Sequence, residues 1–180
     1  KGNADRFQLD DKDVGDVILD VHANTQTGNI GFKVKTDGDQ NAFDINGKYN
    51  FKDTTGTAMD IAVAADRLNL NLIEPYVKTI FSELNGVATG NIRLYGGKDN
   101  MYIVGPATIS NGSALVVFTQ CKYLFNRQKI NFGKDLIEIN GLQLTDTLGN
   151  SGVVSGKIKH HFFRDFAFEN VRMETSKMLL

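Results

Sequence analysis

The side chains best suited to hold a metal ion are three histidines, two of them adjacent at His160 and His161. If this segment is a β-strand, neighbouring side chains point to opposite faces, so the two imidazoles cannot bind one ion together. The third, His22, has no ligand-like cluster beside it in the sequence, whereas a tetrahedral zinc site needs three or four ligands. We therefore expect structural or surface histidines and no metal.

The chain has one cysteine, Cys121, so an intramolecular disulfide is excluded. Cys121 alternates with Tyr123 and Phe125 in an apolar segment, which is the setting of a small buried hydrophobic residue. A reactive thiol instead needs an electropositive, partly exposed environment. The pattern therefore favours a structural role.

Two acidic clusters could bind calcium, and two Gly-Lys pairs could belong to a phosphate-binding loop. The acidic clusters comprise Asp10, Asp11, Asp13, Asp37 and Asp39. Neither has the alternating acidic ligands, central glycine and final glutamate of a calcium loop, so solvated loops are expected. The pairs at 97–98 and 156–157 lack both the first glycine of a phosphate loop and the Ser or Thr that follows its lysine. No dinucleotide fingerprint is present.

Charge argues against nucleic acid as a partner. The sequence has 20 Lys and Arg against 21 Asp and Glu, without the basic excess that a phosphate-tracking surface needs. Basic and aromatic residues do interleave between 122 and 132, but balanced charge favours an amphipathic hairpin over a single-strand-binding platform. Because no acid, base and nucleophile can be assembled, we expect a non-enzyme without a cofactor.

Length and composition indicate a folded domain. The chain has 180 residues, of which 41% are hydrophobic, and no apolar run approaches the roughly 18 residues of a membrane helix. It begins at Lys1 without a signal-like segment. We expect an internal or processed piece of a longer, repeating protein.

Alternation of apolar and polar residues predicts an all-β fold. Val17, Leu19 and Val21 alternate with Ile18, Asp20 and His22, and similar half-buried strands follow around 30–34, 43–51, 59–63, 68–72, 92–94 and 137–139. Antiparallel pairing follows, since one face is apolar and the other solvated. Four Asn-Gly pairs, at 46–47, 85–86, 111–112 and 140–141, predict hairpin turns in a serial meander.

One segment has a helical period instead. Between 72 and 84 the apolar residues follow the stripe of an amphipathic helix. Asn71 and Glu74 resemble a capping box, Pro75 fits the first turn, and the pair at 85–86 fits a left-handed stop. The chain thus divides into a first strand set (1–71), a helix (72–85) and a second strand set (86–180).

Internal similarity suggests an architecture extended by adding strands. The sequence GVATGNIR at 86–93 recurs as GVVSGKIK at 152–159, and TGNI occurs at both 27–30 and 89–92. Irregular spacing argues against a propeller or a strict solenoid.

Several of these elements, in this order, resemble the TamB family of the AsmA-like superfamily, and the later ones resemble its Bacteroidetes-type members. They are AADRLNL at 64–70, LIEPY at 72–76, LNGVATGNI at 84–92, GPATISNG at 105–112, KYLF at 122–125, LTDTLGN at 144–150 and GKIKH at 156–160 with Phe162 and Phe163 following. The resemblance covers roughly residues 40–180. It departs at 96–101, where a proline-containing link is usual.

The resemblance implies a segment of an inner-membrane-anchored protein that crosses the periplasm of a Gram-negative bacterium. It implies a curled sheet, the β-taco, whose apolar trough carries phospholipid between the membranes. A barrel partner of the TamA or BamA kind and neighbouring repeats at both sheet edges are further implications. A chaperone for outer-membrane strands and a plain spacer are the alternatives. The expected trough residues are Val17, Leu19, Val21, Ile30, Phe32, Val34, Phe43, Ile45, Ile61, Val63, Leu68, Leu70, Ile92, Leu94, Ile137 and Ile139.

Overall fold

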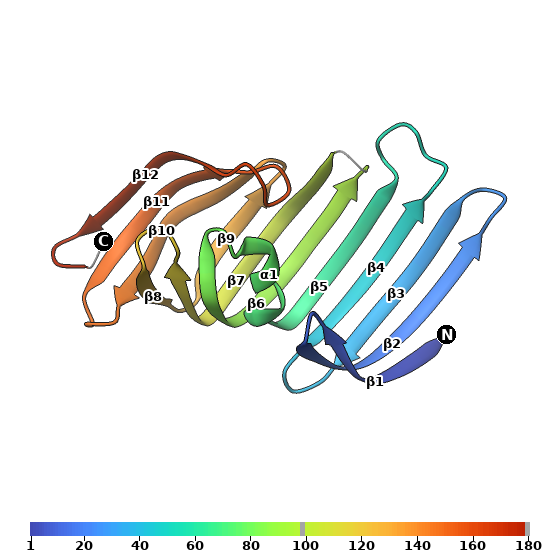
Figure 1. The fold of residues 1–180 in the computed structure, drawn as a ribbon, viewed down its shortest axis with the longest axis horizontal. Helices are drawn as coiled ribbons and strands as arrows, with labels where there is room; N and C mark the ends of the chain where they lie inside the picture. Colours follow the sequence, from blue (N-terminus) through green and yellow to red (C-terminus); the bar gives the residue numbers. More distant parts are fainter. Residues whose placement is uncertain (98–99, 179–180) are drawn as a thin grey trace.

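The computed structural model describes residues 1–97 and 100–178, and these form one large antiparallel sheet with a single short α-helix (Figure 1). The predicted all-β class is thereby confirmed. The strands are β1 (Gly2–Leu9), β2 (Lys12–Asn24), β3 (Asn29–Asp37), β4 (Ala42–Asn50), β5 (Met59–Asn69), β6 (Phe81–Gly96), β7 (Met101–Val116), β8 (Cys121–Phe125), β9 (Gln128–Gly133), β10 (Leu136–Asp146), β11 (Ser151–Lys159) and β12 (Ala167–Thr175). The two predicted strand sets are parts of the same sheet.

Each strand pairs with its neighbours in sequence, so the topology is a meander. One apparent exception involves β8 and β9, which do not form the hairpin predicted between 122 and 132. Both lie between β7 and β10, and Phe125 and Gln128 pair with Gly112 and Ile109 of β7 in one unbroken register. Arg127 has a φ of 53°, so the chain is interrupted there without reversing. The prediction of a hairpin was wrong because β8 and β9 are two halves of one strand.

The helix is present but much shorter than the predicted span of 72–84. A 3₁₀ turn, η1 (Leu70–Leu72), precedes α1 (Glu74–Val77), and β6 already begins at Phe81. Pro75 does stand in the first turn. The apolar period continues beyond α1 because Phe81 and Leu84 pack on the same core from a strand, with Phe81 paired to Val116.

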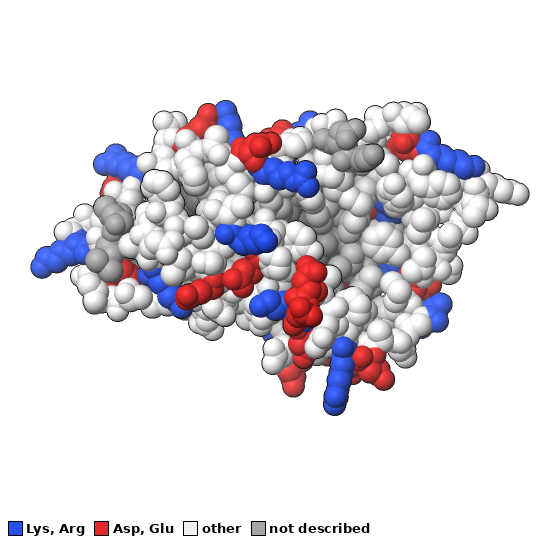
Figure 2. Space-filling model, in the orientation of Figure 1, with Lys and Arg blue, Asp and Glu red and all other residues white. Residues whose placement is uncertain are grey.

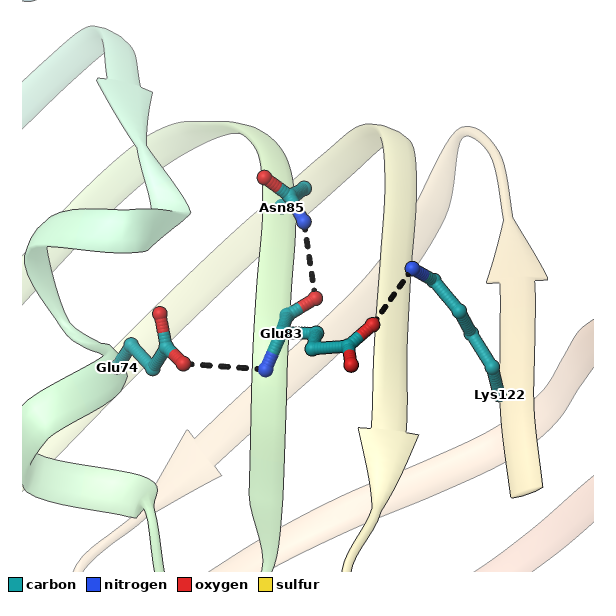
Figure 3. A network of polar contacts seen from close by, with 4 residues as sticks. All are labelled: Glu74, Glu83, Asn85 and Lys122. Carbon is teal, nitrogen blue, oxygen red and sulfur yellow. Dashed lines mark hydrogen bonds and ion pairs between the residues drawn. The ribbon is translucent and has the colours of Figure 1, made fainter. Parts of the chain in front are cut away.

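The predicted caps are replaced by different contacts. Asn69 caps η1, since its side chain accepts a hydrogen bond from the backbone N–H of Asn71. Glu74 reaches β6 instead of Asn71, and its carboxylate accepts the Glu83 backbone N–H at 3.0 Å (Figure 3). Lys122 then pairs with the Glu83 carboxylate at 2.8 Å. The first of these contacts fastens α1 to β6, and the second joins β6 to β8.

The four Asn-Gly pairs lie inside β4, β6, β7 and β10, so the hairpin turns predicted there were wrong. Two of these glycines make room for an aromatic ring on the next strand. Gly47 pairs with Phe32 and Gly112 with Phe125, and a Cβ at either glycine would overlap the partner's ring. Here Gly is required by the close approach of a side chain and not by a turn.

Three of the hairpins, β2–β3, β4–β5 and β10–β11, are built by a different signal, an Asn or Asp whose side chain accepts backbone N–H groups a few residues further on. Asn24 accepts from residues 26 and 27, Asp53 from Thr55, and Asp146 from residues 148 and 150. In each of these turns a glycine follows three or four residues later, at 28, 56 and 149. These are Asx turns, which mimic a backbone turn.

Three clusters of buried side chains lie along the sheet. The first surrounds α1 and joins Leu70 and Val77 to Leu84, Ala88 and Ile109 of β6 and β7. The second joins Val14 and Val17 of β2 to Phe43 of β4 and Leu72 of η1. The third is centred on Tyr123, Leu144, Val154 and Met178.

The sequence similarity between 86–93 and 152–159 is also a structural similarity. In β5–β6 and in β10–β11 alike, two pairs of cross-strand partners are followed by a bulge and then by a third pair. The pair Val63–Ile92 matches Ile137–Ile158, the pair Ala65–Gly90 matches Ile139–Gly156, and the pair Leu68–Ala88 matches Leu142–Val154. In contrast, 27–30 opens β3 from a turn and has no such equivalence to 89–92. The first copy carries η1 and α1 between its strands, whereas the second has only a tight turn.

Candidate functional site

The most distinctive surface of the molecule is an apolar sheet face formed by rows of cross-strand partners on β2 to β6. One row runs through Leu19, Val34, Ile45, Val63 and Ile92, each paired with the next. Partners in an antiparallel ladder point to the same face. The predicted alternation therefore places these five side chains together.

Two further rows extend this apolar face toward the β2–β3 and β4–β5 turns. The second row contains Val21, Phe32, Gly47, Ile61, Leu94 and Ile103. The third contains Ala23, Ile30, Tyr49 and Met59. Tyr49, Met59 and Ile103 were not among the predicted residues, although the same period of two, extended along each strand, would have included them.

Part of this face is uncovered, and the rest, including Val34, Ile45 and Val63, is half-buried. Leu19, Val21 and Tyr49 keep 41%, 47% and 42% of their surface exposed. In the space-filling view of the same side, the area over β3 to β5 is mostly free of Lys, Arg, Asp and Glu, which gather mainly around it (Figure 2). Contiguous exposed apolar surface on a folded domain marks a binding site or an interface.

One end of the open rows is closed by the segment that follows β5. Val17 and Phe43 lie at this end, 6% and 9% exposed, beneath Leu72 of η1. Figure 1 shows α1 on the same side of the sheet, crossing β6. Of the predicted trough residues, Leu68 joins this packing from beyond the β5 bulge, while Leu70 belongs to η1 and not to the sheet. We call the three rows on β2 to β6 the open trough. It excludes Ile103, which is buried on β7, and its first row meets the closed end where Val34 and Ile45 pack against the second cluster.

Toward the C-terminus the same face is partly covered by chain segments that return over it. Ile137 and Ile139 of β10 lie here, together with Phe132 of β9, which pairs with Ile137. Phe163 packs over Phe132 with ring centroids 6.3 Å apart. Met178 packs on the cluster that Ile139 contacts. The sixteen predicted residues are therefore divided between an open part, a closed end and a covered part.

The opposite face of the sheet is charged and paired. Arg93 donates two hydrogen bonds to Asp60, at 2.7 and 2.9 Å, and these hold the pKa of the Asp60 carboxyl below its usual value. Lys157 pairs with Glu138 on the same side at 3.6 Å. The sheet is thus amphipathic, with ion pairs on one face and hydrocarbon on the other.

Two hollows of 330 and 440 Å³ lie on the charged face. The larger is bordered by Asp20, His22, Lys33, Lys48 and Asp60 from β2 to β5. These groups alternate in sign on a floor that includes Gly31 and Gly47. The arrangement offers no nucleophile with an adjacent base.

The histidines and the cysteine that could have bound a metal or acted as a nucleophile lie at separate places on the sheet. His22 is exposed and contacts Asp20 at 3.0 Å, while His160 is buried between aromatic rings on the far part of the sheet. The Cys121 thiol donates to the Thr119 carbonyl at 3.4 Å and packs on the third cluster. Over residues 1–97 and 100–178, no three His, Cys, Asp or Glu side chains gather as a metal site. The Lys98 of one Gly-Lys pair lies outside the described residues.

Fold and face together define a class: an amphipathic meander sheet that leaves part of its apolar face uncovered. No helix in the described part of the chain has the length and apolarity to cross a membrane. Comparison with family models, curated proteins and solved structures returned no match.

Proposed function

We propose that the open trough holds the acyl chains of phospholipids. The observation that carries this proposal is the set of three adjoining apolar rows on β2 to β6, exposed along one side and closed at the η1 end. An alkyl chain lying on these rows would leave water together with the side chains beneath it. Each buried CH₂ contributes about 0.8 kcal/mol.

The composition of the rows limits the selectivity that such a site can have. The open trough offers Leu, Val, Ile and Phe side chains, with the Tyr49 hydroxyl at one margin. Hydrocarbon contacts distinguish one extra methylene by only about 1–3 kcal/mol. The site therefore accepts many acyl chains and leaves the headgroup in water, as a carrier of bulk lipid requires.

In the cell, we propose that the chain acts as one segment of a bridge that carries phospholipid between the inner and outer membranes of a Gram-negative bacterium. Its parent is then anchored in the inner membrane, crosses the periplasm, and works with an outer-membrane barrel of the TamA or BamA kind. The resemblance to the TamB family and the amphipathic meander support this placement. A carrier of this kind needs a hydrocarbon surface and no catalytic group.

The test uses adjacent residues of β5 that face opposite sides. Val63 lies in the first row of the open trough, and Ala62 lies on the charged face opposite Arg93. Binding of a fluorescently labelled phosphatidylethanolamine is measured for Val63→Asp and for Ala62→Asp, with far-UV circular dichroism to show that each variant folds. We expect Val63→Asp to weaken binding at least about tenfold and Ala62→Asp to bind as the parent does. Equal affinities would refute a site on this face.

A second candidate is a chaperone that pairs with unfolded outer-membrane strands. The observation in its favour is that the edge strand β1 is exposed along its whole length, and that the other edge, β12, exposes 59% of Phe168. Free edges are templates for an added strand. This function predicts binding of an amphipathic strand peptide that is unaffected by Val63→Asp, which separates it from the lipid proposal.

A further inference from the structure

The connection between β11 and β12, residues 160–166, differs from its counterpart in the first copy of the internal repeat. There β6 ends at Gly96 and β7 begins at Met101, so the link is short. In the second copy the chain leaves β11 after Lys159 and enters β12 at Ala167. We call residues 160–166 the strap. Its extra length is used to cover part of the apolar face.

The strap is held by aromatic contacts. Phe163 meets Phe132 of β9 edge to face at 6.3 Å and packs against the cluster that contains Ile109 and Ala88. Phe162 lies 5.9 Å from Phe163. The Phe163 ring occupies the apolar face over β9 and β7, next to the open trough on β6.

His160 anchors the strap at its first residue. The imidazole is 3% exposed and stacks on the Phe163 ring, with centroids 5.4 Å apart and planes within 8° of parallel. Its Nδ1 accepts the backbone N–H of Phe163 at 3.3 Å. Its Nε2 is buried and has no hydrogen-bond partner among the described residues. This geometry requires neutral imidazole, because a protonated Nδ1 could not accept that N–H.

The backbone of the strap is strained. Phe162, Phe163 and Asp165 have φ values of 46°, 59° and 50°, in the left-handed region that non-glycine residues avoid. Such conformations persist only where surrounding contacts impose them. The stack and the Nδ1 hydrogen bond are two of those contacts.

We propose that the strap is a proton-released cover: protonation of His160 breaks its hydrogen bond to Phe163, the strap lifts, and the apolar face over β9 and β10 becomes continuous with the open trough. The newly exposed side chains include Ile130, Phe132 and Ile137. Protonation removes the acceptor role of Nδ1 and places a charge on a buried ring whose Nε2 has no partner among the described residues, and the backbone strain favours release.

The ionisable groups around His160 shift its pKa in opposite directions. Asp135, in the β9–β10 turn, accepts the His160 backbone N–H through its carbonyl at 3.1 Å, and its carboxylate favours a charged imidazole. His161 disfavours that charge. Lys134 points elsewhere, with its ammonium 4.2 Å from the Tyr102 ring centre. Burial is the largest influence and lowers the pKa of His160, so the strap is closed at neutral pH and opens on acidification.

Opening of the strap does not depend on what the trough carries. That lipid binds to the longer apolar surface at acidic pH is a separate statement, and it rests on the proposed function. The two can therefore fail separately, and the experiment measures each with its own probe.

The chain contains no tryptophan, so Phe163→Trp introduces a single reporter in the strap. We expect acrylamide quenching of this tryptophan to rise at least about threefold between about pH 7.5 and about pH 5. In the Phe163→Trp background, His160→Gln retains an acceptor without an ionisable ring, and its quenching should stay flat. A Tyr49→Trp reporter in the open trough should not respond, which shows that the domain remains folded. If Phe163→Trp folds poorly, Phe166→Trp, whose ring position is 6.3 Å from His160, replaces it.

A flat quenching profile in the reporter with His160 intact would overturn the proposal, as would an equal rise in the His160→Gln variant. The lipid probe is a labelled phosphatidylethanolamine in detergent-free buffer. Stronger binding at acidic pH that His160→Gln abolishes would support the longer apolar surface. Absence of binding at every pH, with intact quenching changes, would refute the proposed function alone.

Discussion

The ring of Phe32 lies directly over Gly47 on the neighbouring strand. The two residues are cross-strand partners, and a Cβ at Gly47 would occupy the volume of the ring. Phe125 stands in the same relation to Gly112. A glycine inside a strand normally weakens it; here an aromatic side chain fills the gap and shields the backbone.

Gly47→Ala should destabilise the domain, because the added methyl must push the Phe32 ring out of the second row. Overpacking of this kind costs about 1–3 kcal/mol. Urea unfolding followed by circular dichroism measures the change. The matched control is Gly31→Ala on β3, where an added Cβ meets no atom within 4 Å. A neutral Gly47→Ala would mean that the ring can move freely.

Asn41→Ala should be among the more costly polar substitutions in the chain. Asn41 is 1% exposed, donates to the carbonyls of Asp13 and Val14 at 3.3 Å, and accepts the Asn69 N–H at 2.9 Å. Truncation leaves three backbone groups without this partner, one of them buried and two part-buried, at a cost of about 1–3 kcal/mol. Asn46→Ala, at an exposed position of β4, the strand that begins directly after Asn41, is the control in the same denaturation experiment. Equal midpoints would show that the network contributes nothing.

Global stability should also depend on His160. Its pKa is lowered in the folded state by burial, so the unfolded chain takes up the proton first as the pH falls. The contribution to stability is complete above the ordinary histidine pKa of about 6.5 and is lost as the pH falls toward the lowered value. Unfolding free energies measured across this range should therefore decline more steeply in the parent than in His160→Gln. Parallel curves in the parent and in His160→Gln would contradict this dependence.

Photo-crosslinking in the intact parent protein tests the choice of face in cells. A photoreactive residue at Phe32 lies in the second row of the open trough, and one at Lys33 lies on the opposite face, since successive strand residues alternate. Mass spectrometry should find phospholipid adducts at position 32 and none at 33. Polypeptide adducts at 32 would support the chaperone instead, and the absence of any adduct would support a spacer.

The period of two in the sequence was sufficient to predict the sheet and the shared face of its apolar residues. Leu19, Val34, Ile45 and Val63 could be assigned together because a strand residue has only two directions to point. The same rule could not predict which of them would be covered. Coverage depends on η1 and the strap, which return to the face from distant positions in the chain.

Local signals failed where tertiary contacts use the same residues differently. Asn-Gly predicted a turn at 46–47, but the glycine is needed beneath Phe32. The stripe from 72 to 84 suggested a long helix, but Phe81 gains more by pairing with Val116. The Asx turns at Asn24, Asp53 and Asp146 show that a side-chain acceptor three or four residues before a glycine is the better hairpin signal in this chain.

The meander itself has a consequence for how the chain reaches its native state. Apart from β8 and β9, which share the place of one strand, strands that are neighbours in space are also neighbours in sequence, so each pairing closes only a short loop. Low contact order of this kind favours rapid folding for a β protein. Any hairpin can serve as a nucleus from which strands add on both sides, as in repeat proteins. The ends can then fray strand by strand while the middle stays formed, so a protein built this way can be lengthened or shortened in evolution without redesigning its folding route.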